Sequence, residues 1–186
     1  MGQRVGALTG KQAMSVLTYL QGKGNARDAA LWAVGIGTGL RVSDILSLRW
    51  KDVVTAEGSI AGSITVKENK TGNSRTIRLI PLTRDALESL RGDDTDRDSL
   101  VFNLTRQHVR RLVKDWCAAV NLKGDYGTHT MRKAFCTIVY ENSGGDPVNA
   151  ARVTGHSNPS QLMHYIGQTP PTIDRIWKGV ERTLKA

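Results

Sequence analysis

The sequence has no long hydrophobic run and only two cysteines, and these absences exclude several classes of protein. No stretch of about 18 consecutive apolar residues occurs, so we expect no membrane-spanning helix. The opening MGQRVGALTG contains no apolar core of the kind that a secretory signal needs. Cys117 and Cys136 lie far apart without a partner motif, as is typical of small core residues in a reducing compartment. We therefore expect a cytoplasmic protein.

Acidic residues are in the minority. The chain of 186 residues has 17 Asp and Glu against 26 Lys and Arg, which gives a formal net charge of +9. A surplus of this sign favours a polyanionic partner, nucleic acid above all, because binding to phosphates releases counterions. A solvated basic surface remains the alternative interpretation. The length suits one domain, and a hydrophobic content of 39% is ordinary for a globular protein.

The common motifs of metal and nucleotide chemistry are also missing. His129 and Arg132 in THTMRK do not form the zinc pattern HExxH, and no carboxylate lies between them. The glycines of GIGTG do not match the dinucleotide-binding fingerprint, because the third glycine is misplaced and no strand precedes it. The sequence shows no P-loop and no carboxylate cluster of the two-metal nuclease type. We expect neither a metal nor a cofactor.

Hydrophobic spacing predicts a mainly α-helical fold with a small antiparallel sheet, in the α+β class. Capping residues are expected at Thr9, Ser43, Thr83 and Thr105, each before a run of apolar residues at helical spacing. Further helices are expected in NARDAALWAVGIGTG at 25–39, within GTHTMRKAFCTIVYENSGG with a stop at Gly144, from Asp146 and Pro147 onward, at about 159–166, and from about 172. SITV and TIRLIPL flank KENKTGNSR and predict a β-hairpin, and LVF at 100–102 predicts a short third strand.

Two basic residues stand out in the first half of the chain. Arg41, in GTGLRVSDILSLRW, follows a glycine turn and precedes a short helix, where its charge opposes the helix dipole. Lys70, in ENKTGNSR, lies at the expected hairpin tip, with Lys67 and Arg75 as nearby rivals. Taken singly, each residue is more simply explained as an ordinary surface residue.

The second half of the chain adds two histidines, an arginine and a tyrosine. His129 and Arg132 are three residues apart, so a helix would place them on one face. His156 follows a glycine, and Tyr165 lies nine residues later in TGHSNPSQLMHYIG. An amphipathic helix start, a helix-cap histidine and a half-buried core phenol are the structural alternatives.

In their order and spacing these residues together resemble the tyrosine recombinase (phage integrase) family. GTGLRVSDILSLRW is similar to the family's first arginine box, ENKTGNSRTIRLIPL to its lysine hairpin, and THTMRKAF and TGHSN…HYIG to its second box. The resemblance covers about residues 8 to 180. It implies the family's catalytic-domain fold, with about seven to eight helices and a three-stranded sheet. It also implies these catalytic residues: Arg41, Lys70, His129, Arg132, His156 and Tyr165.

The chemistry of these side chains fits the implied reaction. Two guanidinium groups can bind the non-bridging oxygens of a phosphodiester in a bidentate manner as charge develops on them. A tyrosine with a pKa near 10 must lose its proton as it attacks, and a histidine can accept that proton. A hairpin lysine is a plausible general acid for the leaving 5′-oxygen. The predicted enzyme cleaves and rejoins DNA through a 3′-phosphotyrosyl link without metal or ATP.

The resemblance implies a site-specific recombinase that acts as a homotetramer on paired double-stranded DNA sites, in a bacterial nucleoid or a phage-infected cell. Two alternatives stay open. One is a non-catalytic DNA-binding relative, such as a regulator. The other is a nicking-closing enzyme like a type IB topoisomerase, which shares the chemistry but needs no partner subunit.

Several residues are candidates for DNA contact outside the catalytic set. Lys133 stands where the family usually has a histidine, and we expect it to contact phosphate. Arg106, Arg110, Arg111 and Lys114 lie on the predicted helix 105–120 and form a basic face. Phosphate contact is the expected role of most of them, and a solvated basic face is the alternative. Asp44, three residues after Arg41, is expected to support the site without being catalytic.

The expected organisation is a single catalytic domain over residues 1–186, without the N-terminal helical domain that most family members carry. The sequence is compatible with a naturally short protein and with an isolated catalytic domain. The tail at about 168–186 resembles the family's segment that docks on a neighbouring subunit. Packing of the tail on its own domain is the competing interpretation.

Overall fold

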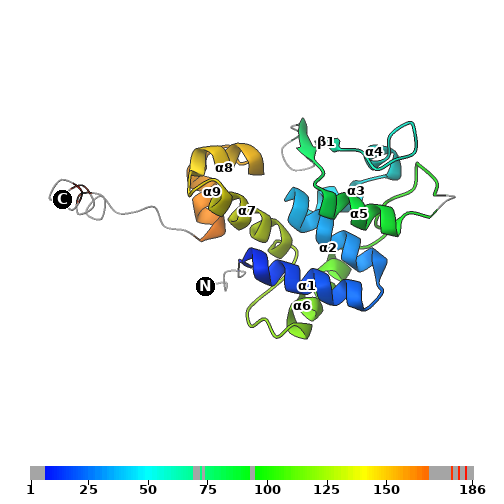
Figure 1. Ribbon diagram of the computed structural model, residues 1–186, viewed down its shortest axis with the longest axis horizontal. Helices are drawn as coiled ribbons and strands as arrows, with labels where there is room; N and C mark the ends of the chain where they lie inside the picture. Colours follow the sequence, from blue (N-terminus) through cyan, green and yellow to red (C-terminus); the bar gives the residue numbers. More distant parts are fainter. Residues whose placement is uncertain are drawn as a thin grey trace.

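The computed structural model describes residues 7–68, 72, 74–92, 95–167, 177, 180 and 183. Over these residues the chain forms nine helices and one two-stranded sheet, which confirms the mainly helical α+β class (Figure 1). No helix in this described part is both long enough and apolar enough to cross a membrane. The helices are α1 Gly10–Gly22, α2 Ala26–Thr38, α3 Val42–Ser47, α4 Trp50–Val53, α5 Pro81–Leu90, α6 Arg106–Ala119, α7 Thr130–Asn142, α8 Pro147–Thr154 and α9 Pro159–Ile166.

The hairpin is confirmed, but the expected third strand is wrong. Strands β1 (Ser63–Lys67) and β2 (Ser74–Arg78) pair antiparallel, with Val66 opposite Arg75. Leu100 makes only an isolated bridge with Arg49. The two residues after it are buried in the core instead, with Val101 6% and Phe102 0% exposed.

Two of the predicted helix caps are also wrong. The structure begins α3 two residues earlier than a cap at Ser43 would, with Arg41 as the N-cap residue, and it adds the short helix α4. Helix α5 begins at Pro81, because proline is favoured in the first helical turn, where its missing N–H costs nothing. Thr83 therefore lies inside α5, and its buried hydroxyl donates to the carbonyl of Ala33 at 3.4 Å. The caps at Thr9 and Thr105 are confirmed.

Helix α2 is the centre of the larger core. Every residue from Asp28 to Thr38 is buried, and α1, α5 and α7 pack around the helix (Figure 1). Trp32 donates from its indole nitrogen to the Ala13 carbonyl at 2.9 Å and packs edge-on against Trp116, with ring centroids 5.8 Å apart. These contacts fix α2, and with it the glycine turn that follows, against the rest of the bundle.

A smaller core lies under α7, α8 and α9, at one end of the molecule (Figure 1). Helix α7 joins the two cores, since Met131 and Ala134 belong to the larger core and Cys136 to the smaller one. The smaller core consists of Cys136, Ala150, Ala151, Leu162, Met163 and Ile166, with Phe135, Val139, Tyr140 and Tyr165 packed against it. Most of the expected C-terminal helix and docking segment falls outside the described residues.

Candidate active site

Arg41 owes its position to a glycine turn at the end of α2. Gly39 caps this helix in the left-handed conformation, with φ of 63°. A Cβ atom at Gly39 would lie 2.1 Å from the Phe135 ring, so only glycine lets the turn approach α7 this closely. Arg41 follows in extended conformation as the N-cap residue of α3, and its side chain is 22% exposed.

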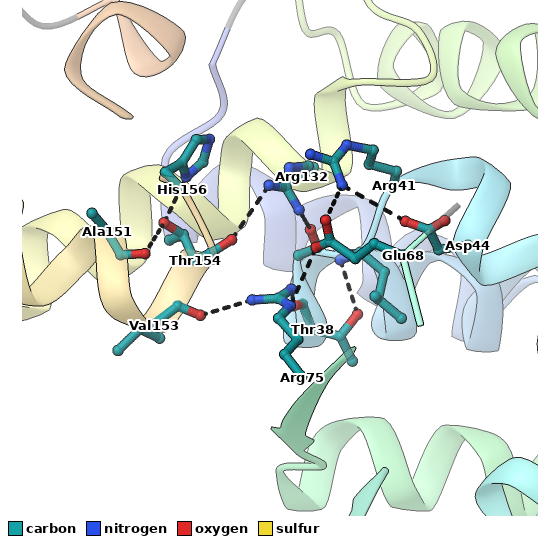
Figure 2. Close-up of polar contacts among 12 residues, drawn as sticks. Thr38, Arg41, Asp44, Glu68, Arg75, Arg132, Ala151, Val153, Thr154 and His156 are labelled. Atoms are coloured by element: carbon teal, nitrogen blue, oxygen red, sulfur yellow. Dashed lines mark hydrogen bonds and ion pairs between the residues drawn. The ribbon is translucent and has the colours of Figure 1, made fainter. Parts of the chain in front are cut away.

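Two buried carboxylates neighbour the Arg41 guanidinium. Nη1 of Arg41 pairs with Oε2 of Glu68 and lies 4.0 Å from Oδ2 of Asp44 (Figure 2). Asp44 is completely buried and Glu68 is 3% exposed. The position of Asp44 agrees with the supporting role expected for it, whereas Glu68 was not among the predicted site residues.

Arg132 is held by backbone carbonyls. It belongs to the first turn of α7 and is 3% exposed. Nη1 donates to the Gly39 carbonyl at 2.5 Å, and Nη2 donates to the Thr154 carbonyl at 3.3 Å (Figure 2). Both acceptors lie at helix C-terminal ends, where the helix dipole favours a cation. This arrangement keeps a buried positive charge between α2 and α8.

Tyr165 lies among three of the other predicted residues. Its hydroxyl oxygen is 3.3 Å from Nδ1 of His129, and its ring centroid is 5.4 Å from that of His156. The amine of Lys133 lies 5.7 Å from the centroid of the tyrosine ring. The phenol is therefore surrounded by groups that can accept its proton or stabilise its anion.

A short polar contact joins Thr154 to His156. The Thr154 hydroxyl oxygen lies 2.7 Å from Nδ1 of His156 (Figure 2). The same hydroxyl lies 2.9 Å from the Ala150 carbonyl oxygen, one turn earlier in α8. These contacts hold the imidazole ring against the C-terminal end of α8.

Burial and the cationic field both shift the titration of these groups. Burial raises the pKa of Tyr165 to about 12, against the opposing effect of Arg132 and Arg41. Burial, reinforced by Arg132 and Arg41, lowers the pKa of His156 to about 4. His129 remains partly open to solvent, yet desolvation by its neighbours still lowers the pKa of its ring, and Arg106 and Arg132 lower it further. At neutral pH the phenol is protonated and both histidines are neutral.

The sequence reasoning missed Glu68 as a site residue and treated Arg75 only as a rival to Lys70. The overlooked signal was the alternation of the hairpin. Ile64 and Val66 face the core, and the same spacing places Glu68 inside with them. A charged residue at such a buried position calls for an ionic partner, and Arg75 lies 3.4 Å away, measured from Nε to Oε1. Lys70 itself lies outside the described residues.

The structure separates the predicted DNA-contact residues into two groups. Arg106 and Arg110 line a cavity of about 490 Å³ whose wall also includes His129. Arg111 and Lys114 are exposed further along α6 and do not line this cavity. Within the described part of the chain, no group of three or more His, Cys, Asp or Glu side chains could hold a metal ion.

Comparison with known proteins identifies the family. A sequence profile described as Phage integrase family matches residues 7–170. The probable integrase/recombinase YoeC of Bacillus subtilis (strain 168) is 30% identical over 174 residues, which cover 90% of this chain and 92% of that protein. Tyrosine recombinase XerC of Chlorobaculum parvum is 28% identical over 170 residues, which cover 81% of this chain but only 48% of that protein.

Solved structures show the same fold. The integrase of transposon Tn1549, in complex with a circular intermediate DNA, superposes with a TM-score of 0.68 at 24% identity, over 98% of this chain and 67% of that one. The chain thus spans about half the length of the XerC relative and nearly all of YoeC. The family profile, which covers most of the chain, and the similarity to YoeC lead to one conclusion: this protein belongs to the phage integrase family.

Proposed function

We propose that the protein is a site-specific DNA recombinase in which Tyr165 cleaves one DNA strand and the broken strand is rejoined to a new partner. The observation that carries this proposal is the position of the Tyr165 hydroxyl. It lies 3.3 Å from His129 Nδ1, within a site whose cations include two arginines suited to binding a phosphodiester. Double-stranded DNA is the proposed substrate, in keeping with the net charge of +9.

In the proposed first step, the tyrosine oxygen forms a bond to phosphorus and the bond to the 5′-oxygen breaks. The phenol proton passes to a histidine, and His129 is placed to accept it because its Nδ1 faces the hydroxyl. Arg41 and Arg132 bind the non-bridging oxygens and stabilise the charge that develops on them. The 5′-oxygen leaves with a proton, a role assigned to Lys70 by its place in the sequence motif.

The second step reverses the first. A 5′-hydroxyl from another strand attacks the phosphotyrosyl phosphorus, and the tyrosine oxygen leaves and regains its proton. The number of phosphodiester bonds is conserved, so the cycle needs no ATP. We propose that the exchange takes place in a homotetramer on two DNA sites, because each new partner strand must be held beside the cleaved one.

A suicide-substrate assay tests the proposal. Duplexes enriched from a randomised pool by binding to the Tyr165→Phe variant are nicked near the centre, mixed with protein in EDTA and run on a denaturing gel. The wild type is expected to give a covalent protein–DNA band, and Tyr165→Phe to bind the same duplex without giving the band. Tight binding by the wild type with no band would instead indicate a DNA-binding relative.

A second readout separates recombination from simple nicking and closing. The same duplex sequence is placed twice on one supercoiled plasmid, and the products are resolved by size. Exchange between the two sites gives deletion or inversion products, which is the result expected here. Relaxation of the plasmid without exchanged products would favour an enzyme of the topoisomerase type.

A further inference from the structure

Two arginines from different elements cross-link the same pair of helix ends. Arg132 donates to the carbonyls of Gly39 and Thr154, as described above. Arg75, from β2, donates to the backbone carbonyls of the two residues that precede Gly39 and Thr154 in the chain. Its Nη1 reaches the Val153 carbonyl at 3.1 Å and its Nη2 the Thr38 carbonyl at 3.5 Å (Figure 2). The C-terminal ends of α2 and α8 are thus joined by two guanidinium groups, each of which donates to both ends.

Arg75 is also joined to Arg41, through Glu68. The Glu68 carboxylate lies between the two guanidiniums, with Oε2 on Arg41 Nη1 and Oε1 3.4 Å from Arg75 Nε (Figure 2). Because Glu68 is 3% exposed, water screens these ion pairs little. The position of Arg41 is therefore tied to the position of Arg75.

Arg75 fits closely against the end of α8. Gly155, which caps that helix with φ of 71°, faces the Arg75 guanidinium. A Cβ atom at Gly155 would lie 2.8 Å from Arg75 Nη1, so a side chain there would displace the arginine. Burial lowers the pKa of Arg75, and the like charge of Arg132 lowers it further, which fits a guanidinium packed within a group of cations.

We propose that Glu68 and Arg75 are positioning residues of the active site: Arg75 joins the hairpin to the ends of α2 and α8, and Glu68 passes that constraint to Arg41. The pair fixes the position of Arg41 relative to Arg132, His156 and Tyr165. Neither residue has to touch DNA for this role. The inference rests on the proposed function in one respect only, namely the reaction for which the site is positioned.

The kinetic test uses Arg75→Gln, Arg75→Lys and Glu68→Gln, with Arg78→Gln as the matched control. Arg78 is a second arginine of β2, and it is exposed. Single-turnover rates of covalent adduct formation are measured on the nicked duplex at saturating DNA, and Kd values on the intact duplex. We expect a rate loss of about 30-fold for Arg75→Gln and about 10-fold for Glu68→Gln and Arg75→Lys, with Kd within about 3-fold of wild type.

The lysine variant distinguishes positioning from charge alone. Lysine keeps the positive charge but cannot contact Glu68 and two carbonyls in the geometry of a guanidinium. Positioning also predicts that the Glu68→Gln, Arg75→Gln double variant is no slower than Arg75→Gln, because both changes break one connection. A wild-type rate for Arg75→Lys, or a weaker Kd with an unchanged rate for Arg75→Gln, would overturn the proposal.

A measurement on the free protein separates this inference from the proposed function. Hydrogen exchange of the arginine Nε–H groups is followed by NMR in wild type and in the same variants. We expect Glu68→Gln and Arg75→Gln to speed exchange at Arg41 by about 10-fold or more, and Arg78→Gln to leave it unchanged. Unchanged exchange at Arg41 in both variants would overturn the positioning role. If the wild type forms no covalent adduct, the proposed function fails, and the exchange result still decides the positioning role.

Discussion

The two sides of the candidate site rest on cores of very different size. Arg41 follows α2, a helix of 13 residues that is buried from Asp28 to Thr38 at the centre of the larger core. His156 and Tyr165 belong to the region of α8 and α9, helices of eight residues each over a smaller core of six buried residues. The proposed nucleophile, Tyr165, is therefore on the less extensively packed side, and guanidinium bridges between α2 and α8 supplement the apolar contacts of that side. We expect motion of that side to change catalysis before it changes the overall fold.

Arg41 and Arg132, the two arginines predicted to bind phosphate, differ in how their charge is balanced. Arg41 pairs with the carboxylate of Glu68, so much of its charge is already balanced. Arg132 donates to two neutral carbonyls, which stabilise its guanidinium without cancelling its charge. Arg132 thus joins the two sides of the site mechanically and also supplies much of its positive potential.

The largest expected effect is a loss of reaction rate on substitution of these two arginines, and its size should differ between them. Arg132→Lys should slow adduct formation by about 1,000-fold or more and Arg41→Lys by about 100-fold, because lysine cannot replace a guanidinium fork. The loss at Arg132 is greater because the bridge between Gly39 and Thr154 is lost as well. Single-turnover rates on the nicked duplex measure both. Equal losses, or near-normal rates in either variant, would contradict the predicted difference between the two arginines.

A core truncation tests the difference between the two sides directly. Leu162 is fully buried in the smaller core, and Leu162→Ala should cost about 2–5 kcal/mol, mainly by opening α8 and α9. Hydrogen exchange by mass spectrometry should show faster exchange in residues 147–166 while α2 stays protected. Leu31→Ala, at an equally buried site in the larger core, is the control and should destabilise the whole fold. If each variant lost protection equally in α2 and in residues 147–166, the two sides of the site would unfold as one unit.

The histidine environment predicts a pH effect on stability. The pKa of His156 is lowered to about 4 in the folded protein, against an unfolded value near 6.5. Between these values only the unfolded chain binds the proton, so stability is lost as pH falls from about 6.5 towards 4, by on the order of 1 kcal/mol after allowance for solvent screening. Urea unfolding from pH 7.5 to 4.5 measures this, and His156→Gln should flatten the slope. Parallel slopes for wild type and variant would exclude His156 as the cause.

The smallest effects are expected on the basic helix α6. Arg106 and Arg110 line the cavity beside His129, whereas Arg111 and Lys114 lie outside it. Changing Arg106 or Arg110 to Gln should weaken DNA binding a few-fold and reduce the salt slope of log K by about 1, the effect of one lost phosphate contact. The same change at Arg111 or Lys114 should have less effect. A larger loss at Lys114 than at Arg110 would place the DNA elsewhere on the helix.

The sequence was sufficient for the residues whose order along the chain forms a motif. Arg41, Arg132, His129, His156 and Tyr165 could be grouped this way, and the structure places them around one site. Figure 2 shows Arg41, Arg132 and His156 of this group. Roles for these residues remain proposals. Helix periodicity likewise predicted the fold class, because helices such as α1 and α6 bury a stripe of apolar residues.

Contacts between distant segments were harder to predict. The bond from Arg75 to Val153 joins residues 78 positions apart, and no local pattern specifies it. The prediction of a third strand was wrong because an apolar triplet can be buried in a core as readily as in a sheet. The buried position of Glu68, by contrast, was available from the alternation of β1 and could have been predicted.

Identifying the tyrosine that becomes linked to DNA tests the proposed role of Tyr165 most directly. The covalent adduct from the nicked duplex is digested with nuclease and protease, and the peptide that carries the nucleotide remnant is sequenced by mass spectrometry. The chain has four tyrosines, Tyr19, Tyr126, Tyr140 and Tyr165. We predict the remnant on Tyr165 alone, with no labelled peptide from the Tyr165→Phe protein. A remnant on any of the other three would contradict it.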